Sequence, residues 1–272
     1  MSHYHWHRGT GLNEAFVIDD AVRTKLIAED ASSAEIIKPF LAGRDIKRYM
    51  PLEPEKHLIL FPRGFTNAKC SGNNKPWDWM KKEYFALAAH LEPFKEKAEK
   101  RCDKGEYWWE LRACDYYGEF EKPKIIYPNI CKKPEFTFDE TGLYTNQKCF
   151  IISLDDKYLF GILNSSVMFF LFNKILPKLR GNFYEPSYVF LKDFPIRRLD
   201  FSNSSDKVAH DQMVSLVNNM LDLNKKLSES KIPQAIEVLK RQIDSTDKQI
   251  DHLVYNLYDL TDEEIKIVES ET

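Results

Sequence analysis

The sequence predicts an α+β fold, a mixed α/β domain followed by a C-terminal antiparallel helical hairpin. Short strand-like runs are scattered among helical segments at irregular spacing over residues 11–200. Beyond residue 200 the pattern changes to two long runs of apolar residues that step by three and four. The short polar link from Ser228 to Pro233 joins these runs, so the two helices should return antiparallel.

The elements expected in residues 11–200 follow from local composition. Runs typical of strands are Val17 to Leu26 (a strand and a turn), Leu58 to Phe61, Lys124 to Tyr127, Phe136 to Phe138 and Cys149 to Ser153. Glu35 to Phe40 indicates a short helix or turn that Pro39 stops. Trp79 to Arg101 has helical spacing with a kink or break at Pro93, and Leu159 to Leu176 is a mostly apolar helix.

The two apolar runs of the tail have the spacing of a coiled-coil seam. The seam residues are Met213, Leu216, Met220, Leu223 and Leu227, then Ile236, Leu239, Ile243, Thr246, Ile250, Leu253, Leu257 and Leu260. Thr261 to Glu264 has the pattern that caps one more short helix. We therefore expect a loose arm over residues 1–10, one domain over residues 11–200 and a separate helical, coiled-coil-like tail over residues 201–272.

Composition is that of a folded chain, with 43% hydrophobic and 13% aromatic residues among 272. The longest apolar stretch, Tyr158 to Phe172, contains an Asn and two Ser, so it is too short and too polar for a membrane span. No signal-peptide pattern opens the chain. The five cysteines are scattered without a Cys-x-x-Cys pair, so we expect free thiols in a reducing cytoplasm.

Charge is distributed unevenly along the chain. The formal net charge is −3, but residues 201–272 hold 8 basic and 14 acidic residues. Residues 1–200 therefore hold 31 basic and 28 acidic residues, a net charge of +3. This asymmetry indicates two parts with different partners, of which only the front part could attract a polyanion.

Catalytic and metal-binding patterns are missing. An amino-methyltransferase needs an Asn/Asp-Pro-Pro-aromatic loop, and the chain has no Pro-Pro pair. Gly9 to Gly11 is the only Gly-x-Gly, and no strand pattern precedes it, as a cofactor-binding turn would require. Glu264 to Lys266 fits a solvated helix face better than a nuclease motif. His3, His5 and His7 fit a flexible arm, so we expect no catalytic residue and no metal site.

Several segments in a fixed order resemble one known module. They are GLNEAF from Gly11, IIKPFLAGRDIKRY at Ile36 to Tyr49, WWELRACDYYGEFEKPKIIYP at Trp108 to Pro128, YLFGILNSSVMFFLF at Tyr158 to Phe172 and FLKDFPI at Phe190 to Ile196. Together they resemble the TaqI-like C-terminal specificity (target-recognition) domain of adenine-specific DNA methyltransferases and of type II (IIG) restriction–modification enzymes. The resemblance covers roughly residues 11–260.

This resemblance implies a domain that chooses a DNA sequence and performs no chemistry itself. Its partners would be double-stranded DNA and a methyltransferase or endonuclease domain, in the same protein or in a separate subunit. No membrane would be involved. S-adenosylmethionine would bind in that catalytic domain, which would flip out and methylate an adenine. The helical hairpin resembles the spacer helices of type I specificity subunits, which would dock domains at a set distance.

DNA recognition needs basic groups for phosphates and Arg, Asn, Gln or Lys for base edges. Four clusters offer such groups: Lys38, Arg44, Lys47 and Arg48; Lys122, Lys124, Lys132 and Lys133; Lys174, Lys178, Arg180 and Asn182; and Arg63, Asn67 and Lys69. In the resembled family, loops of the specificity domain enter the major groove. We therefore favour Arg63 to Lys75 and Lys178 to Tyr184 as base-reading loops, with Arg180 and Asn182 reading bases and Lys132 and Lys133 holding phosphate.

Structural roles compete with these assignments. Arg44 and Asp45 could form an ordinary turn, and Lys132 with Lys133 could be a solvated hairpin. Trp108 and Trp109 are expected to build core, whereas Trp77 and Trp79 should be partly exposed because charged residues surround them.

Three other functions stay open at this point. The chain could be a freestanding specificity subunit that recruits a separate methyltransferase, which an upstream continuation of the reading frame would argue against. It could be a divergent metal-dependent nuclease, which metal-dependent cleavage would reveal, or a helical adaptor without a nucleic-acid role.

Overall fold

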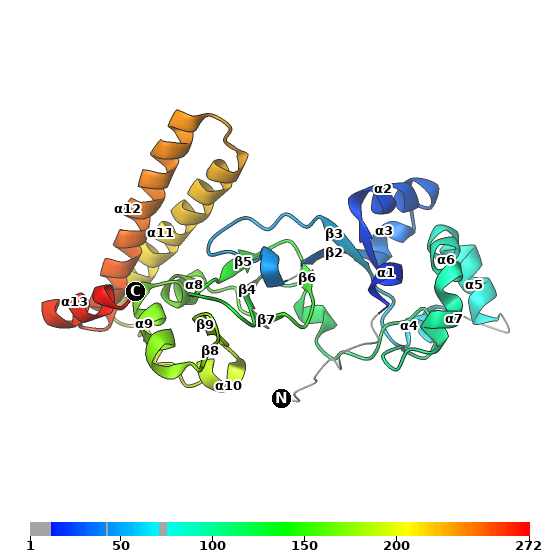
Figure 1. Cartoon of the computed structure of the whole chain (residues 1–272), viewed down its shortest axis with the longest axis horizontal. Coiled ribbons are helices and arrows are strands. Elements are labelled where there is room, and N and C mark those ends of the chain that lie inside the picture. Colours follow the sequence, from blue (N-terminus) through cyan, green and yellow to red (C-terminus); the bar gives the residue numbers. More distant parts are fainter. Residues whose placement is uncertain (1–11, 42, 71–74) are drawn as a thin grey trace. The chain divides into compact units, whose positions relative to one another are not determined.

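The computed structural model describes residues 12–41, 43–70 and 75–272 (Figure 1). The chain divides into two compact units, each assembled from separate stretches of sequence. Unit 1 comprises residues 1–41, 53–122 and 141–147, and unit 2 comprises residues 42–52, 123–140 and 148–272. The arm predicted over residues 1–10 lies outside the described residues.

Unit 1 contains a four-stranded sheet with the strand order β1-β3-β2-β6. The strands are β1 (Val17–Asp19), β2 (Ile37–Leu41), β3 (Lys56–Ile59) and β6 (Tyr144–Thr145). β3 pairs antiparallel with both β1 and β2, and β6 pairs parallel with β2. Ile18, Ile37 and Ile59 are buried, so the sheet contributes directly to the core of this unit.

Short helices make up most of unit 1 outside the sheet. They are α1 (Asn13–Phe16), α2 (Asp20–Glu29), α3 (Ser33–Ile36), α4 (Phe65–Lys69), α5 (Pro76–Glu83), α6 (Phe85–Leu91) and α7 (Lys95–Glu99), with 3₁₀ turns η2 (Glu92–Phe94) and η3 (Tyr117–Glu119). Their starts have local causes. The side chain of Asp19 accepts a hydrogen bond from Val22 N at 2.8 Å and caps α2, and Pro76 occupies the first position of α5.

Three predicted elements of unit 1 have different boundaries in the structure. The strand and turn predicted at 17–26 are one three-residue strand and most of α2, because the Asp19 cap starts a helix at once. The helix or turn predicted at 35–40 is the end of α3 followed by β2, in which Pro39 lies within the strand. The helix predicted at 79–101 is three helices, interrupted near Tyr84 and again at the 3₁₀ turn that contains Pro93.

Unit 2 is organised around a three-stranded antiparallel sheet with the strand order β5-β4-β7. Its strands are β4 (Lys124–Pro128), β5 (Thr137–Asp139) and β7 (Cys149–Ile152), and a second, two-stranded sheet pairs β8 (Lys178–Leu179) with β9 (Phe183–Tyr184). The 3₁₀ turn η1 (Gly43–Asp45) and the short helix α10 (Tyr188–Leu191) also belong to this unit. All five residues of β4, the central strand of the sheet, are buried, so this strand lies within the unit 2 core.

The apolar helix predicted at 159–176 is two helices, α8 (Lys157–Leu163) and α9 (Ser166–Ile175). The break has a local cause, since the Ser165 hydroxyl accepts a hydrogen bond from Met168 N and caps α9. Among the described residues no single helix is long and apolar enough to cross a membrane. The α8–α9 pair meets that length and composition only together, with a bend of 57° between its halves.

The predicted helical hairpin is confirmed. α11 (Ser204–Glu229) and α12 (Pro233–Leu257) run side by side and are joined by three residues (Figure 1). The last helix, α13 (Asp262–Ser270), begins at the predicted capping box, in which Thr261 and Glu264 bond each other's backbone N–H groups.

The hairpin shares its core with the rest of unit 2 rather than forming a separate tail. A Cβ built on Gly161 of α8 would lie 2.4 Å from the Sδ of Met213 in α11, so these helices need a glycine at their contact. One buried apolar cluster contains Tyr49, Ile125, Phe136, Phe160, Phe172, Met213, Val217, Ile250, Leu253 and Val254. The compact units therefore do not divide at residue 200, because seam residues of both long helices cover α8 and α9.

Candidate nucleic-acid interface

The β8–β9 hairpin presents polar side chains at an exposed tip. Three residues connect its strands, Arg180, Gly181 and Asn182, and all three are exposed. Gly181 and Asn182 have φ values of 86° and 60°, the left-handed region that Gly and Asn tolerate better than other residues. Neither Arg180 nor Asn182 has a side-chain hydrogen bond or ion pair within the described part of the chain. The predicted reading loop at 178–184 therefore offers free donors.

A second basic segment lies directly beside this hairpin. Cys131 N donates to Tyr184 O at 3.1 Å, and Tyr184 N donates to Cys131 O at 2.7 Å. This pairing places the exposed Lys132 and Lys133 next to β9, and Lys132 Nζ lies 5.1 Å from the ring centroid of Phe183. Burial raises the pKa of the Cys131 thiol to about 12, so the thiol adds no negative charge here.

We call this surface the hairpin surface and define it as Lys132, Lys133, Lys178, Arg180 and Asn182. It joins groups from two clusters that are about 50 residues apart in the sequence. Lys178 Nζ lies 5.8 Å from the ring centroid of Tyr184, on the partner strand β9.

The hairpin surface is anchored to the helices of unit 2. The Tyr184 hydroxyl donates to Asn173 Oδ1, and Asn173 Nδ2 donates to the carbonyl of Glu271 at 2.8 Å. Lys174, a member of the predicted third cluster, forms an ion pair with the Glu271 carboxylate at 2.8 Å. Lys174 is therefore partly neutralised, whereas the anchored hairpin keeps its position relative to α9.

The first predicted cluster is dispersed in the structure. Lys38 lies in unit 1 and pairs with Glu121 at 3.0 Å, whereas Lys47 lies in unit 2 and pairs with Glu135 at 3.2 Å. Arg44 falls in η1, and its side chain is outside the described part of the structure. Lys47 is exposed, so of the two lysines it retains the better access to solvent.

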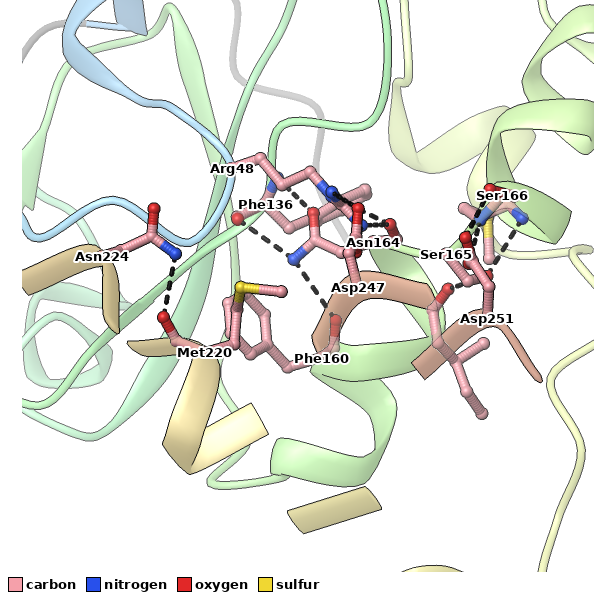
Figure 2. A network of polar contacts seen from close by, with 12 residues as sticks. Arg48, Phe136, Phe160, Asn164, Ser165, Ser166, Met220, Asn224, Asp247 and Asp251 are labelled. Carbon is pink, nitrogen blue, oxygen red and sulfur yellow. Dashed lines mark hydrogen bonds and ion pairs between the residues drawn. The ribbon is translucent and has the colours of Figure 1, made fainter. Parts of the chain in front are cut away.

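Arg48 is a correction to the predicted DNA contacts. Its Nη1 donates to Asp247 Oδ2 at 2.6 Å, and Nε and Nη2 donate to the Asn164 carbonyl at 3.0 and 2.6 Å (Figure 2). Burial disfavours the charged guanidinium, but the hydrogen bond to Asp247, together with the charges of Tyr49, Asp247 and Asp251, outweighs burial and raises the pKa of Arg48. Arg48 therefore joins the 42–52 segment to α12 instead of binding phosphate.

The same polar network ties the α8–α9 break to neighbouring segments (Figure 2). The Asn164 side chain accepts from Phe136 N at 3.1 Å and donates to Phe136 O at 3.2 Å. Ser166 donates from its N–H and its hydroxyl to Asp251, at 2.8 and 2.7 Å. Asp247 and Asp251 lie four residues apart on one face of α12, so both carboxylates meet this network.

Lys124 is a second correction. It was one of four lysines in the second predicted cluster, but its side chain is fully buried and pairs with Asp139 of the adjacent strand β5. Its neighbour in sequence, Lys122, is 61% exposed and pairs with Glu119 at 2.6 Å. Only Lys132 and Lys133 of this cluster belong to the hairpin surface.

In unit 1 the predicted residues Arg63 and Asn67 both contact Glu106, a carboxylate that was not predicted from the sequence. Arg63 Nε lies 3.8 Å from Glu106 Oε1, and Asn67 Nδ2 donates to Glu106 Oε2. The Tyr107 hydroxyl donates to Asn67 Oδ1 at 2.6 Å. Lys69, at the end of α4, lies over the Phe65 ring at 5.8 Å. Residues 71–74 of the predicted loop at 63–75 lie outside the described residues.

Glu110 holds this group of residues in place. It is completely buried, and its carboxylate accepts hydrogen bonds from the backbone N–H groups of Gly64, Thr66 and Glu106 at 3.2, 2.9 and 2.9 Å. Trp109 Nε1 donates to the Thr66 hydroxyl at 3.0 Å. Such a carboxylate fixes the start of α4 and joins it to the segment at 106–110.

The tryptophans have the predicted environments. Trp108 and Trp109 are buried, and Trp77 and Trp79 are half-buried. No group of three or more His, Cys, Asp or Glu side chains that could hold a metal ion occurs within the described ranges.

Comparison with known families assigns the fold. The model of the TaqI-like C-terminal specificity domain matches residues 38–196, and the chain belongs to this family. This result confirms the resemblance drawn from the sequence segments.

Two curated relatives are type II methyltransferases of Haemophilus influenzae. M.HincII is 30% identical over 192 residues, which are 64% of this chain and 37% of the relative. M.HindII, from strain Rd, is 32% identical over 135 residues, which are 44% of this chain and 25% of the relative. The chain thus matches between a quarter and two fifths of the length of these relatives.

A solved structure has a similar fold. It is the type IIL restriction–modification enzyme MmeI in complex with DNA, with a TM-score of 0.59 over 91% of this chain and 31% of that one. The sequence identity is 11%, so this comparison concerns the fold alone.

Proposed function

We propose that the chain is the part of a restriction–modification adenine methyltransferase that recognises the DNA target. It binds double-stranded DNA and positions a short site for a catalytic domain that lies outside these 272 residues and binds S-adenosylmethionine. The observation that carries this proposal is the hairpin surface, where two basic segments meet on one exposed β-hairpin with a polar tip. Membership in the specificity-domain family supports the same function.

The hairpin surface has the shape and chemistry for major-groove recognition. The major groove admits a two-stranded β-ribbon, and Arg and Asn are the side chains that pair bidentately with guanine and adenine. Arg180 and Asn182 are two residues apart at the exposed tip of such a ribbon. Lys132 and Lys133 lie beside the second strand of the ribbon, where phosphates would pass if the tip entered the groove.

We expect salt-sensitive binding to DNA. The few cations of the hairpin surface can neutralise only a few phosphates, so affinity for mixed-sequence duplex should be about 10⁻⁴–10⁻⁶ M at physiological salt. Fluorescence anisotropy with a labelled duplex, measured between about 50 and 200 mM salt, checks this expectation. An affinity that does not change with salt concentration, or no binding at the lowest salt, would contradict the proposal.

Arg180 and Lys133 should have different effects when replaced. Arg180→Ala should cost about 1–3 kcal/mol of binding to the preferred site and relax the preference at one base pair. Lys133→Ala should weaken all sequences alike and reduce the salt slope by about 1, because it removes one phosphate contact. Selection from a random duplex library, followed by salt titration of each variant, measures both effects.

Lys226→Ala is the matched control, because it removes one exposed cation at the end of α11, outside the hairpin surface. It should change neither the preferred sequence nor the salt slope. If Lys133→Ala changed the preferred sequence while Arg180→Ala left it untouched, the two roles would be assigned the wrong way round.

A further inference from the structure

We propose that Glu106 is a specificity-determining residue that accepts a hydrogen bond from the exocyclic amino group of a cytosine or an adenine in the DNA site. Arg63 lies beside it as the paired donor. This inference rests on the proposed function and concerns unit 1 by itself. It also replaces Asn67, which the sequence pattern favoured as a base-reading side chain.

The amide of Asn67 is already engaged at both ends. Its Nδ2 donates to Glu106, and its Oδ1 accepts from the Tyr107 hydroxyl at 2.6 Å. These two hydrogen bonds fix the orientation of the amide toward Glu106 and Tyr107, although one N–H and one lone pair of Asn67 remain unused. Asn67 therefore acts as a positioning residue that holds the Glu106 carboxylate.

Glu106 keeps accepting capacity at the surface. Its side chain is 38% exposed, and a carboxylate has about four lone-pair sites, of which Asn67 uses one. Its backbone is fixed, because Glu106 N donates to the buried Glu110 carboxylate at 2.9 Å. An exposed acceptor on a fixed backbone, with a guanidinium 3.8 Å away, is suited to reading a base edge.

A carboxylate discriminates between bases because of its charge. In the major groove cytosine and adenine present an amino group, whereas guanine O6 and thymine O4 are acceptors that would repel it. A carboxylate near DNA also repels phosphates, so it weakens binding to every sequence unless an amino group meets it. Arg63 reduces this repulsion locally and can donate to an adjacent base or phosphate.

Two substitutions separate geometry from charge. Glu106→Gln keeps the length of the side chain but replaces the carboxylate with one acceptor and one donor. Glu106→Asp keeps the charge and withdraws the acceptor by one methylene. If Glu106 reads a base, Glu106→Asp should lower the preference for cytosine or adenine at a single position by about 5- to 150-fold, and Glu106→Gln should shift the preference at that same position toward adenine, which Gln pairs bidentately. Preferences at other positions should persist.

The experiment is selection from a random duplex library with the whole chain, followed by competition binding with single-base variants of the selected site. Glu92→Gln is the control, because it removes an exposed carboxylate elsewhere in unit 1 and should leave every preference unchanged. Thermal unfolding of each variant, compared with the parent chain, confirms that the protein remains folded.

Two results would overturn the inference while leaving the proposed function intact. In one, Glu106→Gln binds all sequences more tightly by the same factor and Glu106→Asp changes nothing, which would make Glu106 a repulsive charge only. In the other, the selected site is identical for the parent chain and both variants. If the parent chain itself selects no sequence, the proposed function fails as well, which distinguishes the two failures.

Discussion

Replacing Lys124 with alanine should lower the free energy of unfolding of unit 2 by about 3–5 kcal/mol. The side chains of Lys124 and Asp139 are 0% and 1% exposed, and they form an ion pair between β4 and β5. Removing the ammonium leaves the Asp139 carboxylate without this counter-charge in the interior, which is the costly way to break such a pair. Urea unfolding followed by far-UV circular dichroism measures the effect.

Lys122→Ala is the appropriate comparison, because it removes a lysine from the same sequence cluster at a position that is 61% exposed. Its ion pair with Glu119 lies in solvent, so the change in stability should stay below about 1 kcal/mol. Equal stability of the two variants would contradict the buried ion pair. A loss of salt-dependent DNA affinity in folded Lys124→Ala would likewise return this residue to the DNA-binding surface.

These two lysines show why the site could be predicted only in part. Lys, Arg and Asn can be found by residue type, and the glycine before Asn182 indicated a turn at the hairpin tip. Burial depends on partners that local sequence does not reveal. Asp139 lies 15 residues from Lys124, and Asp247 lies 199 residues from Arg48. No periodicity links such pairs, so a buried cation and an exposed one look alike in the sequence.

The hairpin surface also depends on a contact between residues far apart in the sequence. Lys132 and Lys133 lie beside the tip only because Cys131 pairs with Tyr184 across 53 residues. Glu106 was missed because its importance lies in contacts with the segment that begins at Arg63. Two carboxylates in a segment otherwise rich in aromatic residues were the available signal.

The fold was more accessible than the site, because helical spacing and strand composition are local properties. The two long helices α11 and α12 and the cap of α13 were predicted correctly for this reason, although the predicted seam extends to Leu260, beyond the end of α12, and omits the buried Val217 and Val254. The break between α8 and α9 was not, although Asn164 and Ser165 are poor residues for an apolar helix. Tertiary bonds from Asn164 to Phe136 help fix that break. A change of composition near residue 200 predicted a separate tail, but composition does not report which apolar surfaces pack together.

Leu253→Asp should therefore destabilise the whole of unit 2 and not just the hairpin. Leu253 is 8% exposed, between the fully buried Ile250 and Val254, in the cluster that contains Phe160 and Ile125. A carboxylate there would be buried without a partner, and we expect a loss of about 4–5 kcal/mol. A tail with its own core would instead unfold alone and leave residues 123–200 ordered.

The tryptophans provide an internal reference for this experiment. Unit 2 contains no tryptophan, and the described tryptophans, Trp77, Trp79, Trp108 and Trp109, all lie in unit 1. Tryptophan emission should therefore keep the transition of the parent chain while far-UV circular dichroism shows early loss of helix. Hydrogen exchange should show that β4 and α8 lose protection together with α11 and α12.

Val238→Asp, at a position of α12 that is 53% exposed, should change stability by less than about 0.5 kcal/mol. Retained protection of β4 and α8 in Leu253→Asp would restore the boundary at residue 200, because it would show that the hairpin unfolds by itself.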